Sequence, residues 1–309
     1  MPAVGELSFR TAGLEGTMLA DGRRHGVTRL VHRPSGVELT GGPGPLLALY
    51  RILCRDGWLG EAREMRHAVE AGDDGLRLVW EPRALHLARL EAYFQVRSDD
   101  ALDLEVTVTG CAAYEAYEVF LSNYFHPALR SGGYVRPSGE PPEAQCAGMV
   151  QIEPEAHPVF RNLYVTLPRD EAAAHLFTDG RWQRGRHWTR FLPARYYSRP
   201  MGYYRHQAAN VDVLIMGLEA DVPAVSMAYA PGDFGPDHVS DHHSLYFSLW
   251  GRDLRPGARW CTKLRLVVGA WGGDPNEHLR HWQAFAAEAA ATGRCGAQPV
   301  TDVSGIFSG

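Results

Sequence analysis

The chain has 309 residues, of which 45% are hydrophobic and 22% charged, and its formal net charge is −5. This composition is typical of a folded protein with an ordinary core, and it excludes intrinsic disorder. The basic residues are spread along the chain, so the sequence predicts no nucleic-acid-binding surface.

The first third of the chain is predicted to form β-strands. Strand patterns occur at residues 26–31, 37–39, 46–53, 76–80, 85–95 and 102–109. The first two flank a turn at Arg33–Gly36, which contains Pro and Gly. In 102–109, Leu and Val alternate with Asp, Glu and Thr, which indicates a strand with one buried face. Residues 98–100 are expected to be the hairpin turn before that strand.

The middle of the chain, residues 117–205, has a different composition. It is rich in Pro, Gly, Arg, His and aromatic residues, and we expect it to form long loops between strands. Because functional residues often lie in loops held by a rigid scaffold, we expect these loops to line the ligand site on the concave face of one sheet.

The last third is predicted to return to strands and to end in one helix. Strands are expected at 211–218 and 224–229, and residues 244–250 and 260–268 are predicted to form a hairpin. The helix is predicted over 275–292, because Asp274 is a good N-cap, Pro275 is tolerated at the first position and Glu277 completes a capping box. These elements predict an all-β fold with one C-terminal helix.

The cysteines and the terminal segments predict a cytoplasmic protein. Cys54, Cys111, Cys146, Cys261 and Cys295 are widely spaced, and we expect reduced thiols that form no zinc site. Met1–Gly16 shows no secretory signal, and the apolar stretch 211–229 is interrupted by acidic residues and a proline, so no membrane span is predicted. No nucleotide-binding motif is present, and we expect no cofactor.

Three segments resemble the galactose mutarotase-like superfamily, which includes the aldose 1-epimerases. They are the opening strand-turn-strand segment 26–39, the segment Phe120–His126 and the segment 253–269. The resemblance implies a large antiparallel β-supersandwich whose open face binds carbohydrate. We expect a single domain over residues 1–295, which includes the helix at 275–292, followed by a surface tail at 296–309.

The resemblance does not extend to the catalytic residues. Aldose 1-epimerases of this superfamily have a general-acid His in an Asn-His-x-Tyr-Phe context and a general-base Glu near the penultimate strands. When Tyr124 and Phe125 are aligned with that motif, Ser122 stands where the acid His is implied, and residues 225–231 contain no carboxylate. Mutarotation needs one group to protonate the ring oxygen and another to accept the anomeric hydroxyl proton.

Three residues are the candidates for relocated acid/base chemistry. His126 follows the resembling segment and could act as a displaced acid or base; the alternative is a loop histidine that hydrogen-bonds to the backbone. Asp241 and His243 would share one face if a strand begins there, and the alternative is a solvated loop. No metal site is predicted, because no metal-ligand spacing is present.

Aromatic and arginine residues of the middle segment are the candidates for substrate binding. Aromatic faces stack on the apolar side of sugars, and guanidinium groups bind hydroxyls or a carboxylate. The candidates are Asn123, Arg161, Tyr164, Trp188, Arg190, Tyr197, Arg199 and Arg205. The concentration of arginines suits an acidic sugar. The alternative is that the aromatic residues pack the loops and the arginines cap carbonyl groups.

The function expected from these features is action on, or binding of, a carbohydrate. The first hypothesis is a sugar isomerase or epimerase with rearranged acid/base residues, acting on a sugar or a sugar acid. The alternatives are a non-catalytic carbohydrate-binding protein, and a polysaccharide lyase or hydrolase. The expected partner is a carbohydrate ligand, with no nucleic acid and no membrane. The sequence does not determine the oligomeric state.

Overall fold

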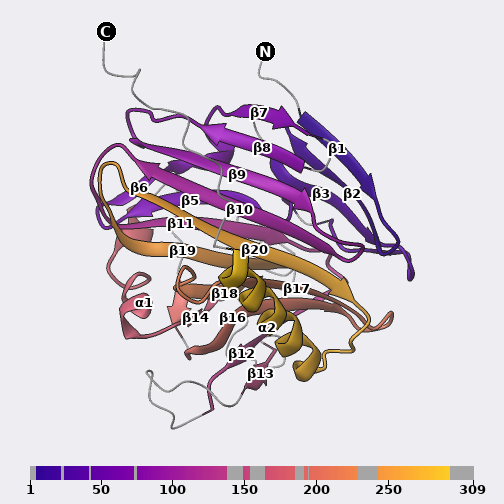
Figure 1. The fold of residues 1–309 in the computed structure, drawn as a ribbon. Helices are drawn as coiled ribbons and strands as arrows, with labels where there is room; N and C mark the ends of the chain where they lie inside the picture. The colour runs from indigo at the N-terminus through magenta and orange to yellow at the C-terminus, as the bar shows by residue number, and fades with distance from the viewer. Residues whose placement is uncertain are drawn as a thin grey trace, which may run out of the picture.

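The computed structural model describes most of the chain in nine stretches, and they form three β-sheets and a C-terminal helix (Figure 1). The described residues are 5–21, 24–41, 43–72, 75–137, 149–153, 164–184, 191–193, 195–228 and 243–292. The strands pair antiparallel, except that β14 and β15 pair parallel. The prediction of an all-β sandwich with one substantial helix is confirmed.

The two larger sheets join strands that are far apart in the sequence, whereas the four-stranded sheet is made of consecutive strands. The nine-stranded sheet has the order β13 (Val150–Ile152), β12 (Arg130–Val135), β16 (Tyr197–His206), β17 (Val211–Gly217), β20 (Arg259–Gly269), β10 (Ala101–Gly110), β9 (Ala88–Val96), β8 (Gly75–Trp80) and β7 (Ala68–Ala71). The seven-stranded sheet has the order β15 (Phe191–Pro193), β14 (Tyr164–Pro168), β18 (Ala224–Ala228), β19 (Ser244–Leu254), β11 (Tyr114–Tyr124), β5 (Ala48–Cys54) and β6 (Gly57–Glu61). The four-stranded sheet has the order β1 (Gly5–Arg10), β2 (Leu14–Ala20), β3 (His25–His32) and β4 (Val37–Glu38).

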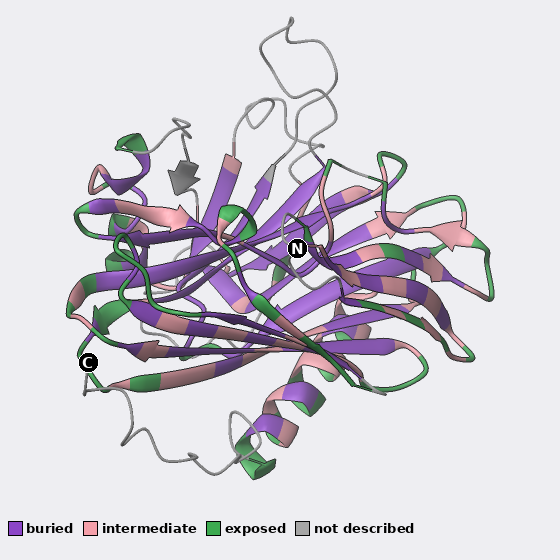
Figure 2. Cartoon of the chain, turned by 90° about the horizontal axis from the view of Figure 1, so that it is seen from above, coloured by how far each residue is buried: buried purple, intermediate pink, exposed green. Residues whose placement is uncertain are grey.

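The main hydrophobic core lies between the two larger sheets. Leu104 and Val106 of β10 face this core from the nine-stranded sheet, and Val119 and Leu121 of β11 face it from the seven-stranded sheet. Full burial of such a side chain contributes about 1.5–3 kcal/mol relative to exposure. Figure 2 shows buried residues along the strands and exposed residues mainly at the turns. The prediction that the strand at 102–109 has one buried face is therefore confirmed, because one side of β10 faces the core.

A second layer of packing covers the other face of the nine-stranded sheet. Helix α2 (Pro275–Thr292) lies across β16, β17 and β20 (Figure 1), and its Phe285 packs with Met201 and Met216. The carboxylate of Asp274 accepts a hydrogen bond from the Asn276 N–H at 2.9 Å, so the predicted N-cap is confirmed. Among the described residues, no helix combines the length and apolar character needed to cross a membrane.

The prediction that residues 244–250 and 260–268 form a hairpin is wrong. β19 pairs with β11 and β18 in the seven-stranded sheet, whereas β20 pairs with β10 and β17 in the nine-stranded sheet. The connection between them therefore crosses from one layer to the other. Alternation correctly shows that β19 and β20 each have one buried face. These two faces pack on the same core from opposite sheets, so alternation alone does not show whether the strands pair with each other.

Two further expectations are corrected. The described part of the middle segment is not mainly loop, because it holds most of β11 and of β16, strands of 11 and 10 residues. The thiols are not all reduced: Cys54 and Cys111 are free, but Cys261 is disulfide-bonded. A segment rich in aromatic residues and arginines can form a strand when these side chains are buried. The spacing of cysteines along the sequence does not show which of them lie close together in the fold. The predicted tail at 296–309 lies outside the described residues.

Candidate functional site

The site begins with one face of the seven-stranded sheet. Because Val119 and Leu121 of β11 face the main core, the alternate residues Phe120, Ser122 and Tyr124 lie on the opposite face. We call this side the outer face. Tyr246 of β19 lies directly across from Ser122 on the same face. This central pair of strands therefore presents a row of aromatic and hydroxyl groups away from the core.

One half of the outer face is closed by the segment 171–184, which contains α1 (Glu171–His175) and the 3₁₀ turn η4 (Arg181–Gln183). The Trp182 ring lies 4.7 Å from the Phe120 ring in an edge-to-face arrangement. Beside it, the buried Arg181 guanidinium lies 3.2 Å from the Glu118 carboxylate and 2.8 Å from that of Asp179. These buried ion pairs and ring contacts hold the segment 171–184 against this half of the sheet.

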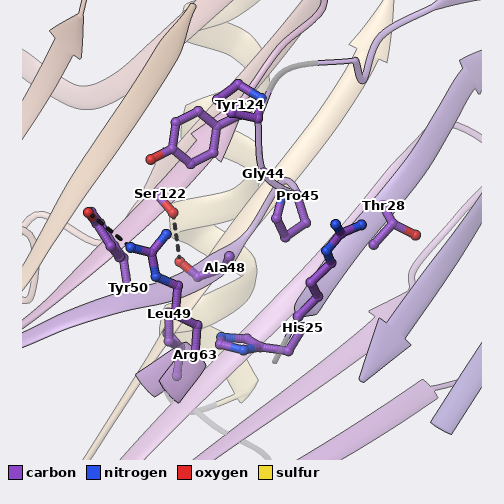
Figure 3. Close-up of a pocket in the computed structure, with 12 residues that line it drawn as sticks. His25, Thr28, Gly44, Pro45, Ala48, Leu49, Tyr50, Arg63, Ser122 and Tyr124 are labelled. Carbon is purple, nitrogen blue, oxygen red and sulfur yellow. Dashed lines mark hydrogen bonds between the residues drawn. The ribbon is translucent and has the colours of Figure 1, made fainter. Parts of the chain in front are cut away.

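The other half of the outer face forms a cavity of about 540 Å³ (Figure 3). It lies where β3 meets the chain before β5, through a bridge between Val27 and Leu46. The lining residues are Arg24, His25, Thr28, Pro43, Gly44, Pro45, Ala48, Leu49, Tyr50, Arg63, Ser122 and Tyr124. This volume is within the range of roughly 300–1,000 Å³ that is usual for small-molecule sites.

A cluster of tyrosines continues the cavity wall along the outer face. The Tyr246 ring lies 6.2 Å from the Tyr124 ring and 5.9 Å from the Tyr164 ring. Burial raises the pKa of Tyr164 to about 12, and it also raises the pKa of Tyr124. These hydroxyls are therefore neutral at physiological pH and can both donate and accept hydrogen bonds.

Two arginines converge on one tyrosine at the edge of the cavity. The Tyr50 hydroxyl accepts hydrogen bonds from Nη2 of Arg51 at 3.0 Å and from Nη2 of Arg63 at 3.4 Å. The Arg63 guanidinium also lies over the Tyr50 ring, 4.4 Å from its centre, and its Nε donates to the Glu61 carboxylate at 2.5 Å. These contacts hold a planar donor group and an aromatic face in fixed positions beside the cavity.

His25 is a buried, uncharged part of the cavity lining. Its ring lies 5.2 Å from the Trp80 ring and 5.9 Å from the His67 ring, and neither ring nitrogen meets the distance and angle of a hydrogen bond within the described chain. Burial lowers the pKa of His25 to about 3, with His67 acting in the same direction and a backbone contact to Leu49 opposing it. The ring is therefore an uncharged part of the cavity wall, and its buried nitrogens lie out of a ligand's reach.

Asn123, a predicted substrate-binding residue, lies on the core side of β11. Its Oδ1 accepts a hydrogen bond from the Leu47 N–H at 2.7 Å, and its Nδ2 donates to the Leu245 carbonyl at 2.9 Å. Leu47 has a φ of 57°, a left-handed conformation that is uncommon for leucine. The Asn123 amide is thus used to hold the chain that leads into Ala48 and the cavity.

The two predicted catalytic residues that the structure describes, His126 and His243, lie outside the cavity lining. His126 is half-buried after β11, and its Nδ1 accepts the Ala128 N–H at 3.1 Å, which is the backbone-bonded alternative weighed above. His243 is buried before β19, and its carbonyl accepts the Phe125 N–H at 2.8 Å. Neither residue belongs to the cavity lining. Asp241 lies outside the described residues.

Of the remaining predicted residues, only Tyr164 is described on the outer face. Tyr197 is buried in the main core, where its hydroxyl donates to the Val222 carbonyl at 2.7 Å. Arg199 lies 5.0 Å from the Trp282 ring of α2, and Arg205 is paired with Asp212 at 2.8 Å. These three residues belong to β16 of the other large sheet. Arg161, Trp188 and Arg190 lie outside the described residues.

None of the described residues predicted for the site lines the cavity. Ser122, which stands where the resemblance implies the acid His, lines the cavity together with Tyr124 of the same motif. Arg24, Tyr50 and Arg63 have no local motif that marks them as a site. The described residues also contain no group of three or more His, Cys, Asp or Glu side chains that could hold a metal ion.

Comparison with known proteins identifies the fold. No protein-family model and no curated protein sequence matches the chain. A proposed aldose 1-epimerase from Escherichia coli K12 matches with a TM-score of 0.52 and 11% identity, covering 86% of this chain and 99% of that one. A galactose mutarotase-like protein from Lactobacillus casei ATCC 334 matches with a TM-score of 0.50 and 10% identity, covering 86% and 100%. The chain therefore has the galactose mutarotase-like fold that its sequence resembles.

Proposed function

We propose that the protein binds a carbohydrate in the cavity on the outer face of the seven-stranded sheet. The observation that carries this proposal is the position of Ser122 and Tyr124 in the cavity wall. The resemblance places the catalytic motif of sugar epimerases at these residues, and the fold is the one those enzymes use. The motif and the cavity were identified independently, one from the sequence and the other from the coordinates.

The cavity has the groups that sugar binding requires. The Tyr50 ring, held by Arg63, supplies an aromatic face for the apolar side of a sugar ring. The hydroxyls of Ser122 and Tyr124 and the guanidinium groups of Arg24 and Arg63 supply hydrogen-bond partners for sugar hydroxyls. A mixture of apolar walls and a few fixed polar groups is typical of small-molecule sites.

Binding without catalysis is the function that this geometry supports best. The described cavity lining contains no carboxylate, and hydrolysis of a glycoside usually needs a pair of them. The low pKa of His25 makes its ring a weak base, which argues against proton abstraction by a lyase. A sugar isomerase would need an acid/base partner at the cavity, and neither His126 nor His243 lines it.

Isothermal titration calorimetry with a panel of mono- and disaccharides tests the proposal. We expect binding to the wild-type protein and affinity about fivefold lower for the Tyr50→Ala variant, since an aromatic contact is worth about 1 kcal/mol. Tyr93→Ala is the matched control, because Tyr93 is also half-buried and also lies near an arginine, 5.6 Å from Arg77, but on β9 of the other large sheet. Absence of binding by the wild type, or equal loss in both variants, would overturn the proposal.

A further inference from the structure

We propose that the cavity selects an anionic sugar, one that carries a carboxylate or a phosphate, over a neutral sugar. This inference rests on the proposed function and adds the chemical class of the ligand. The two anionic groups share the property that matters here, because both accept hydrogen bonds from guanidinium groups and both carry negative charge.

The charge of the cavity lining is the first line of support. Arg24 and Arg63 both line the cavity, and none of the twelve described lining residues is acidic. Tyr124 and His25 are neutral at physiological pH and do not offset these charges. Glu61, which is not part of the lining, pairs with Nε of Arg63, so Arg24 carries the charge that this pair does not offset. A cleft lined by charge of one sign concentrates ligands of the opposite sign.

The second line of support is that Arg24 is available. Its side chain is exposed at the cavity, and the guanidinium makes no hydrogen bond or ion pair with any described residue. The interaction recorded for this residue with Asp21 is made by the backbone N–H, not by the side chain. An arginine whose donors are unused can form the bidentate contact that a carboxylate or a phosphate accepts.

The third line of support is the arrangement around Tyr50. Two guanidinium groups, those of Arg51 and Arg63, donate to the same hydroxyl, so Tyr50 holds both positive groups on its side of the cavity. Glu61 is buried with its carboxylate on Nε of Arg63, which leaves the terminal nitrogens of Arg63 on the Tyr50 side. The positive groups are therefore grouped on one wall, as Figure 3 shows for Arg63 beside Tyr50.

A simpler account is that the arginines only pack the tyrosine ring, since guanidinium stacking on aromatic faces is common in proteins. That account fits Arg51, which is buried against Tyr50 and Trp58. It does not fit Arg24, which the described residues neither pair nor place over an aromatic ring. Packing alone predicts equal affinity for charged and neutral sugars, so the two accounts differ in a measurable result.

The experiment compares glucose, glucuronate and glucose 6-phosphate as ligands of the full chain by calorimetry at low and at high salt. We expect at least one charged sugar to bind about tenfold more tightly than glucose at low salt, with a smaller difference at high salt. The two charged ligands distinguish a carboxylate site from a phosphate site. Arg24→Gln should remove most of the preference and Arg24→Glu should reverse it.

The controls separate this inference from the proposed function. Arg29→Gln changes an exposed arginine of β3, the strand that follows Arg24; Arg29 is paired with Glu15 at 2.8 Å, and the substitution should leave the preference unchanged. Equal affinity for all three sugars would overturn the inference while sugar binding stands. Inorganic phosphate that binds as tightly as glucose 6-phosphate would also overturn it, because the site would then recognise an anion and not a sugar. If no sugar binds, the proposed function itself is refuted.

Discussion

Nε2 of His278 on α2 lies 3.3 Å from Oδ2 of Asp212 on β17, and both side chains are completely buried. The same carboxylate accepts the Gly273 N–H at 2.6 Å and Nε of Arg205 at 2.8 Å. On its other side, Nδ1 of His278 lies 2.6 Å from the Tyr134 hydroxyl. A polar network thus ties the helix to the nine-stranded sheet, in addition to the apolar contacts of Phe285.

Asp212→Asn should destabilise the protein and change its acid sensitivity. The substitution leaves the Arg205 charge without its partner, which costs about 3–5 kcal/mol for a buried pair. Burial alone would raise the pKa of Asp212, but hydrogen bonds from His278, Gly273 and Arg205 outweigh it and lower the pKa below 3.8. The carboxylate therefore stabilises the folded state above its unfolded pKa, and this contribution is lost as the pH falls through the lower, folded value.

Urea unfolding of wild type and Asp212→Asn at pH 7 and at pH 3 measures both effects. The difference in unfolding free energy between the two proteins should be largest at pH 7 and should shrink at the lower pH. A difference that is the same at both pH values would contradict the assignment of an ionised, stabilising Asp212.

We expect His25 to make the folded state less stable in acid, over a higher pH range than Asp212 does. Its pKa is lowered by burial from 6.5 to about 3, so the unfolded chain binds a proton that the folded state does not. Stability should therefore fall as the pH drops from about 6.5 toward 3, by about 1.4 kcal/mol per pH unit from this group. His25→Phe keeps an aromatic ring that cannot titrate, and its stability should depend less on pH in this window.

The control for His25 is an exposed histidine. His175→Gln at the end of α1 removes a titratable group without burial, so its unfolding free energy should follow the wild-type pH dependence. If His25→Phe and wild type lose stability in parallel between pH 6.5 and 4, the ring of His25 is not a buried neutral group.

The fold could be predicted from the sequence to the level of elements but not of pairing. Alternation located β10 and β20, and the capping pattern at Asp274 located α2, because both signals depend only on residues that are close in the sequence. The partners of β19 and β20 depend on which layer each strand enters. The alternation of buried residues does not show which sheet a strand joins. A hairpin is therefore predicted at the point where the chain passes from one sheet to the other.

The site could be predicted only where a motif marks it. Ser122 and Tyr124 line the cavity and are aligned with the epimerase motif by the resemblance, although neither was predicted as a site residue. The other walls come from β3 and from the chain around β5 and η1 (Ala62–Glu64), which reach Ser122 only through long-range strand pairing. No sequence motif marks Arg24 and Tyr50. Arg199 and Arg205 were predicted from the arginine-rich composition of the middle segment, but Arg199 contacts α2 and Arg205 pairs with Asp212.

Asn123→Ala should destabilise the chain that leads into the cavity. The substitution removes the acceptor of the buried Leu47 N–H and the donor to the Leu245 carbonyl, and an unsatisfied buried group costs about 1–3 kcal/mol. Because Leu47 is held in a left-handed conformation, ligand affinity should also fall as Ala48 and Leu49 shift. Chemical denaturation and calorimetry measure the two effects. Asn276→Ala, at an exposed position, should change stability by less than about 0.5 kcal/mol.

We expect the protein to accelerate the mutarotation of glucose or galactose no more than the buffer does. The position implied for the acid His is Ser122, and residues 225–231 supply no carboxylate. Loss of one acid/base partner typically lowers the rate by about 10²–10⁴-fold, and here both implied partners are absent. The cavity lining offers no substitute pair, because its histidine has a pKa of about 3 and the Tyr124 pKa is raised by burial.

Polarimetry or exchange NMR on freshly dissolved sugars measures this rate, with His126→Ala alongside the wild type. Nδ1 of His126 already accepts the Ala128 N–H, so this substitution should leave the slow rate unchanged. Rapid mutarotation that His126→Ala abolishes would instead identify His126 as a relocated acid or base. Rapid mutarotation that the substitution leaves untouched would refute the expected inactivity and exclude His126 as its source. If Tyr50→Ala abolishes an acceleration of mutarotation that Tyr93→Ala keeps, the reaction takes place in the cavity. That result would refute the proposal that the protein only binds its ligand.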